Sequence, residues 1–205
     1  RMNILNGRKS LVSQSSPGNV LQWVLDQDQV PRAALSMDMK KKRWWFSYRS
    51  ASGGEWKKLA EWNENLNNVV IPYAFDPADP KSMYVRSNVG RDTLAFFKFD
   101  PEAGKLGEVV VGTDRYDMGS FLLIGSPLGE RGSLIFGGTE EKPGALIGVH
   151  FQGPTRTTAW FDDEARKLQA AIDASLPGTV NLFDPTKPRS LIYSYSGREP
   201  GRSEE

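Results

Sequence analysis

Short apolar runs, separated by turn-forming residues, recur along this chain in the pattern of β-strands. Four of these runs resemble one another: Leu21–Asp26, Val70–Asp76, Phe121–Ser126 and Val180–Asp184. Their last residues are spaced by 50, 50 and 58 positions. The chain therefore has an internal repeat of about fifty residues, which has to be recognised before the fold class is assigned.

In each whole repeat, the sequence predicts three further strands after the first one. Glycine-containing turns separate them, among them Gly53-Gly54 and Pro143-Gly144, and glycine supplies the positive φ that tight reversals need. Four short antiparallel strands in about 40–50 residues are typical of a β-propeller blade. We therefore expect an all-β fold, a partial β-propeller of four-stranded antiparallel blades. Three whole blades are predicted, at 20–62, 69–112 and 119–161.

The longer third interval contains a helical insertion at 162–178. Apolar residues recur there at helical spacing, Asp162 or Asp163 is a suitable N-cap, and Pro177-Gly178 ends the pattern. One amphipathic helix near 163–176 is predicted, lying on the surface of the sheets.

Half-blades are expected at both ends, the end of one blade at 1–14 and the start of another at 179–196. A closed ring of six to eight blades needs roughly 300–400 residues, so 205 residues are too few to complete one. The sequence predicts a single partial domain that belongs to a longer polypeptide. Unpaired half-blades would also favour self-association.

Composition excludes several classes of site. With no cysteine and a single histidine, His150, the chain has no disulfide, no thiolate metal site and no multi-histidine metal site, so no metal or cofactor is expected. No apolar run reaches the ~20 residues of a membrane-spanning helix. The net charge of +1 offers no field for nucleic acid. Neither the cytoplasm nor the periplasm is favoured.

The dense basic run Lys40–Arg43 precedes the aromatic residues Trp44, Trp45 and Phe46. Aromatic side chains beside basic ones can stack nucleic-acid bases. A solvated hairpin turn that guards a sheet edge explains the same residues. Because there is no second basic cluster, we favour the turn and expect no nucleic-acid partner.

No catalytic residue is predicted. The nearest match to a Gly-x-Ser-x-Gly nucleophile elbow is Gly125-Ser-Pro-Leu-Gly129, in which the serine is misplaced. Pro127 would also remove the backbone N–H that an oxyanion hole needs. His150 alternates with apolar residues on a predicted strand, where a structural role is expected.

Several sequence segments, by their order and spacing along the chain, resemble the N-terminal propeller of bacterial prolyl-oligopeptidase-family serine peptidases. They are Val30–Ala34, Ser87–Thr93, Phe99–Glu108, Thr158–Asp162, Leu168–Gly178 and Ser194–Arg202. In that family the propeller caps a C-terminal α/β-hydrolase domain with a Ser-Asp-His triad and restricts entry to peptides. The resemblance implies a segment that gates and selects peptides for a hydrolase domain outside this chain.

Fold alone does not give function, so a non-enzymatic propeller that binds a protein or another ligand remains the alternative. Arg91 and Asp92 are the polar loop residues expected to contact substrate or the partner domain, because propeller loops at one end of the strands face the funnel. An ordinary hairpin turn, in which Asp92 bonds its own backbone, is the competing interpretation.

Overall fold

A computed structural model describes residues 2, 4–9, 15–50, 53–119, 132–138, 143–183, 185 and 191–196. It contains thirteen strands and one helix in this part of the chain. The described residues form two compact units, one reaching to Arg115 and the other beginning at Tyr116.

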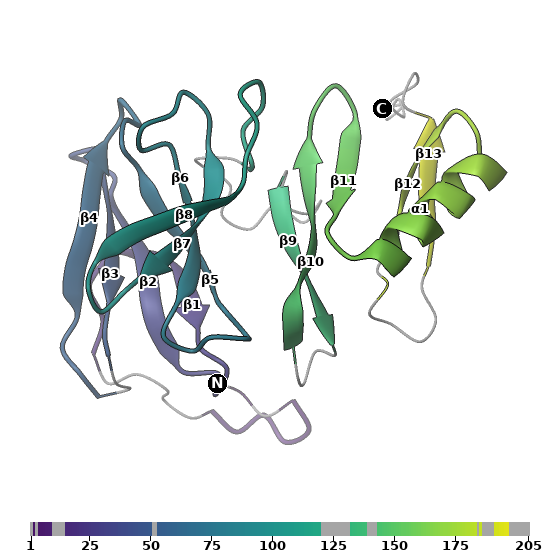
Figure 1. The fold of residues 1–205 in the computed structure, drawn as a ribbon. Helices are drawn as coiled ribbons and strands as arrows, with labels where there is room; N and C mark the ends of the chain where they lie inside the picture. The colour runs from purple at the N-terminus through teal and green to yellow at the C-terminus, as the bar shows by residue number, and fades with distance from the viewer. Residues whose placement is uncertain are drawn as a thin grey trace, which may run out of the picture. The chain divides into compact units, whose positions relative to one another are not determined.

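The first unit consists of two four-stranded antiparallel sheets, each a simple meander (Figure 1). The first sheet contains β1 (Val20–Leu25), β2 (Pro31–Asp38), β3 (Arg43–Tyr48) and β4 (Lys57–Asn63). The second sheet contains β5 (Val70–Phe75), β6 (Met83–Ser87), β7 (Ala95–Asp100) and β8 (Lys105–Val111). Consecutive strands are neighbours in both sheets, so each repeat of about fifty residues builds its own sheet.

Equivalent aspartates start equivalent turns in the two sheets. The Asp26 Oδ1 atom accepts hydrogen bonds from the backbone N–H groups of Asp28 (3.0 Å) and Val30 (2.9 Å) after β1. Fifty residues later, Asp76 Oδ1 accepts one from Ala78 N–H (3.0 Å) after β5. A short carboxylate that bonds the backbone two residues on stabilises a turn, which explains the repeated aspartate.

The core of the first unit lies between the two sheets. Phe46 from β3 is fully buried, and its ring centroid lies 5.5 Å from that of Phe99 in β7. Met83 and Val85 of β6 are also fully buried in this cluster. The sheets therefore pack face to face through apolar side chains, which a single four-stranded sheet could not bury alone.

The second unit combines a three-stranded antiparallel sheet, a helix and a two-stranded sheet (Figure 1). Its elements are β9 (Gly132–Gly138), β10 (Pro143–Gln152), β11 (Arg156–Trp160), α1 (Asp163–Ser175), β12 (Thr179–Leu182) and β13 (Tyr193–Ser196). Asp162 caps α1 by accepting a hydrogen bond from Ala165 N–H (2.8 Å). Ala165 and Ile172 face inward and pack with Trp160 and Phe183.

The all-β class is confirmed, and the expected helix is present within one residue of its predicted end. Residues 10–14 of the expected half-blade and the expected strand Phe121–Ser126 lie outside the described residues. Met2 and Lys9 form an isolated antiparallel bridge in the segment predicted to end a blade. At 13 residues, α1 is too short to cross a bilayer, and it is the one helix in the described part of the chain.

Candidate functional site

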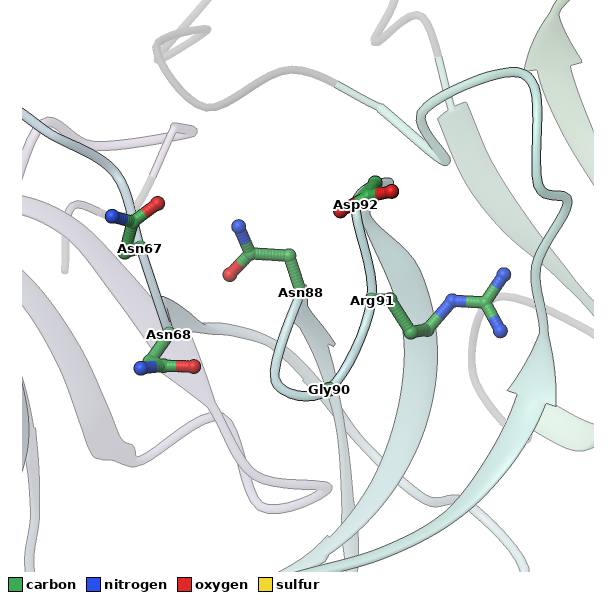
Figure 2. Close-up of a pocket in the computed structure, with 6 residues that line it drawn as sticks. All are labelled: Asn67, Asn68, Asn88, Gly90, Arg91 and Asp92. Carbon is green, nitrogen blue, oxygen red and sulfur yellow. The ribbon is translucent and has the colours of Figure 1, made fainter.

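An open hollow of about 410 Å³ lies at one end of the second sheet. Two loops line it: the connection from β4 to β5 and the loop from β6 to β7. The lining residues are Asn67, Asn68, Asn88, Gly90, Arg91 and Asp92 (Figure 2). Both residues singled out in the sequence, Arg91 and Asp92, belong to it, whereas the three asparagines were not anticipated.

The β4–β5 connection has a strained backbone that Asn88 holds in place. Leu66 and Asn68 have positive φ values, 53° and 54°, which side chains other than glycine adopt at a cost. Asn88 Nδ2 donates to Leu66 O (2.9 Å), and Asn88 Oδ1 accepts from Val69 N–H (2.9 Å). Ser87 Oγ adds a bond to Val69 O (2.7 Å). These bonds leave the Asn67 and Asn68 side chains exposed.

The Arg91 guanidinium binds to the chain just after β8. Its Nη2 atom donates to Thr113 O (3.0 Å) and to Asp114 Oδ1 (3.2 Å). Gly112 is required beside it, because an added Cβ would lie 2.6 Å from Ala95 Cβ and 3.3 Å from Arg91 Nη2. Figure 2 shows the Arg91 side chain directed away from the asparagines. In this structure, Arg91 therefore fastens the β6–β7 loop to the end of β8.

Asp92 presents its carboxylate to solvent. It lines the hollow and also a smaller one of about 260 Å³, which it shares with Arg91, Thr93 and Asp114. No hydrogen bond or ion pair to this carboxylate is found among the described residues, including one to its own backbone. Asp92 is therefore available to a ligand.

We expect Asn88→Ala to lower the free energy of unfolding by about 1–3 kcal/mol, because two backbone groups of a strained loop lose their partner. Asn67→Ala is the matched control: its exposed side chain makes no hydrogen bond among the described residues, and its cost should stay within about 0.5 kcal/mol. Urea unfolding of both variants measures the difference. Equal costs would show that Asn88 does not hold the loop.

Of the other candidates, His150 has structural partners within the second unit. His150, on β10, has its Nδ1 atom 2.7 Å from Thr158 Oγ1 and its ring edge-on to Trp160. Ser126 lies outside the described residues. Among the described residues, no group of three or more histidine, aspartate and glutamate side chains is placed to hold a metal ion.

The basic run at 40–43 is largely paired with acidic side chains. Lys42 Nζ lies 2.5 Å from Glu64 Oε2, Arg43 Nη1 lies 2.9 Å from Glu61 Oε1, and Lys41 Nζ lies 3.9 Å from Asp38 Oδ2. Asp38 also accepts from the Lys40 and Lys41 N–H groups, as a turn residue does. This geometry favours the hairpin-turn interpretation.

A polar network joins the two sheets of the first unit at the end where the β1–β2 and β7–β8 turns lie. Arg32 Nη2 donates to the Tyr48 hydroxyl (3.0 Å), which donates to Glu102 Oε1 (2.9 Å). In the second sheet, Lys98 Nζ binds Asp76 Oδ2 and lies 4.2 Å from the centre of the Tyr84 ring.

Burial raises the pKa of Tyr48 above its ordinary 10.0, and the hydrogen bond to Glu102 raises it further. Burial also raises the pKa of Tyr84. For Lys98, burial lowers the pKa, but the hydrogen bonds with Asp76 and Tyr84 outweigh it and the pKa rises above 10.5. All three groups are therefore held in their protonated forms by the folded chain.

Alkaline pH should weaken the first unit. A group whose folded-state pKa is raised contributes stability below its unfolded pKa and loses it as the pH rises through the folded value. We expect the free energy of unfolding to fall as the pH rises above about 10. Tyr48→Phe removes one of these groups, so the free energy of unfolding of this variant should fall less steeply with rising pH. Urea unfolding at several pH values tests this. If the free energy of unfolding falls equally in the wild-type chain and in Tyr48→Phe, Tyr48 does not contribute to the pH dependence.

Comparison of the chain with protein-family models, with curated proteins and with solved structures found no match. The roles of the residues that line the hollow follow from their contacts: Asn88 and Arg91 shape the two loops, whereas Asn67, Asn68 and Asp92 present unused polar groups.

Proposed function

We propose that this chain is part of a β-propeller of the prolyl-oligopeptidase type, which gates and selects peptide substrates for an α/β-hydrolase domain. The observation that supports this most strongly is the stacking of two successive repeats. Each forms its own four-stranded antiparallel meander, and the two sheets pack face to face around Phe46 and Phe99.

The next repeat supports the same proposal. In sequence, β9, β10 and β11 take the second, third and fourth strand positions of that repeat, with the antiparallel order β9-β10-β11. Successive blades of this kind bury the faces that each would expose alone, which is why they occur in rings. The sequence segments that resemble the peptidase propeller, such as Ser87–Thr93, support peptides as the substrate class.

The physical task of such a segment is exclusion. A narrow funnel admits a flexible peptide and keeps a folded protein from the hydrolytic site. That task needs shape and polar loop residues and does not need a nucleophile. At one end of the second sheet, we propose Asp92 for contact with the peptide or with the partner domain, and Arg91 for holding the loop that presents it, through Thr113 and Asp114. If Arg91→Ala leaves the kinetics unchanged for peptides of every length, it has no substrate role.

A non-enzymatic propeller that binds another ligand is the second candidate. The open hollow with its unpaired Asp92 carboxylate is the observation that favours it. The two candidates differ in what the reading frame encodes after Glu205. The peptidase proposal expects a Gly-x-Ser-x-Gly elbow followed by Asp and then His. A stop codon at that point would favour the binding module.

A fluorophosphonate probe tests the proposal with protein in hand. We expect no labelling of this chain alone, because its one imidazole, that of His150, bonds Thr158 within a sheet. The longer polypeptide should be labelled at a single serine beyond residue 205. Stoichiometric labelling within the chain would contradict its non-catalytic role. Failure to label the longer polypeptide would overturn the peptidase proposal.

A further inference from the structure

We propose that the hollow between the β4–β5 connection and the β6–β7 loop binds a primary ammonium group carried by a peptide. The Asp92 carboxylate would pair with the ammonium, and the carboxamides of Asn67 and Asn68 would bond the adjoining peptide groups. The choice of peptides as the ligand class rests on the proposed function. The charge and polarity of the ligand follow from the hollow itself.

The negative charge of Asp92 favours a cationic ligand in the hollow. The Asp92 carboxylate is exposed at the rim and has no partner among the described residues. The nearest cation on the same loop, the Arg91 guanidinium, is directed away and bonds Thr113 O and Asp114. An ammonium group brings three donors, and a hydrogen bond between two charged groups is stronger than a neutral one. An anionic ligand would instead meet the charge of Asp92.

The exposed carboxamides of Asn67 and Asn68 favour a ligand that carries peptide groups. A carboxamide both donates and accepts hydrogen bonds, as a peptide bond does. Asn88 uses its carboxamide inside the protein, on Leu66 O and Val69 N–H. Asn67 and Asn68 carry exposed carboxamides that make no hydrogen bond among the described residues. They are therefore free to bond a ligand.

The hollow is formed before any ligand arrives. Positive φ values at Leu66 and Asn68 are costly, and the bonds from Asn88 and Ser87 hold them in the folded chain. A loop already fixed in its binding shape loses less entropy on binding. Its volume of about 410 Å³ lies within the range of small-ligand sites, roughly 300–1,000 Å³.

The source of the ammonium, a peptide N-terminus or a lysine side chain, can be separated by titration. We would follow backbone amide NMR signals of the full chain with trialanine amide, N-acetyl-trialanine amide and N-acetyl-Ala-Lys-Ala amide. Saturable shifts confined to residues 67–69 and 88–92 are expected with at least one of the two ammonium-bearing peptides. Whichever of them binds identifies the source. The uncharged N-acetyl-trialanine amide should give no saturable shift.

Asp92→Asn should weaken this binding by up to about fivefold, as expected for loss of an exposed charge pair. Asp28→Asn is the matched control, because Asp28 is exposed at the first sheet's β1–β2 turn and should leave affinity unchanged. Equal binding of the uncharged peptide, equal loss in both variants, or no shift at these loops would overturn the inference. None of these results affects the fluorophosphonate test, so the two proposals fail separately.

Discussion

Phe46→Ala is expected to lower the free energy of unfolding of the first unit by about 3–5 kcal/mol, the usual cost of truncating a buried aromatic side chain. Phe46 is fully buried and lies between the two sheets, with the Phe99 ring 5.5 Å away. Because interiors are closely packed, the neighbouring side chains can fill only part of the space left by the ring. The cost is a large fraction of the 5–15 kcal/mol typical of a domain.

Val109→Ala is the control for Phe46→Ala. Val109 lies on β8 and is 45% exposed, so its truncation should cost less than about 1 kcal/mol. Urea unfolding compares the two variants. Native-state hydrogen exchange adds a sharper test, because β2 and β7 should both lose protection in Phe46→Ala if the sheets stabilise each other. Loss confined to the first sheet would show that the two sheets fold independently.

Trp160→Ala is expected to have a similarly large effect in the second unit, about 3–5 kcal/mol. Trp160 is 7% exposed, and its ring centroid lies 5.1 Å from that of Phe183. Its Nε1 atom donates to Gln169 Oε1 (3.1 Å) on α1. Gly148 leaves room for the ring, since an added Cβ there would lie 2.7 Å from Trp160 Cε3. Trp160 therefore links β10, β11, α1 and the chain after β12.

Trp160→Phe separates the packing of this residue from its hydrogen bond. Phenylalanine keeps most of the aromatic contact but loses the bond to Gln169, so we expect a cost well below that of alanine. Circular dichroism at 222 nm during urea unfolding reports α1 directly. A cost for Trp160→Phe as large as that for Trp160→Ala would mean that the hydrogen bond, and not the ring packing, holds α1 in place.

The strands and the helix were predictable because their signals are local and repeated. A turn-starting aspartate at Asp26 recurs as Asp76, and each accepts a hydrogen bond from the backbone N–H two residues further on. The cap at Asp162 and the stop at Pro177-Gly178 bound α1 within one residue of its expected end. Turn and capping bonds span only a few residues, so the order of amino acids is enough to show them.

The hollow was not predictable in the same way, because it is built from residues far apart in the chain. The Asn88 carboxamide bonds Leu66 and Val69, about twenty positions earlier, and Arg91 bonds Thr113 about as far ahead. Arg91 and Asp92 were predictable as polar loop residues, but the amino-acid order does not show that, in the described part of the chain, Arg91 is bonded within the protein while Asp92 is not. The Asn67-Asn68 pair offered one usable signal, since asparagine tolerates positive φ.

The proposed gating role is tested most directly by comparing one cleavable peptide sequence in two settings. The longer polypeptide that the proposal expects would be given this sequence as a short free peptide and within a rigid loop of a folded protein. If the propeller gates entry, the short peptide is hydrolysed and the folded protein stays intact. Comparable hydrolysis of both substrates would contradict gating, and hydrolysis of neither would contradict the peptidase assignment.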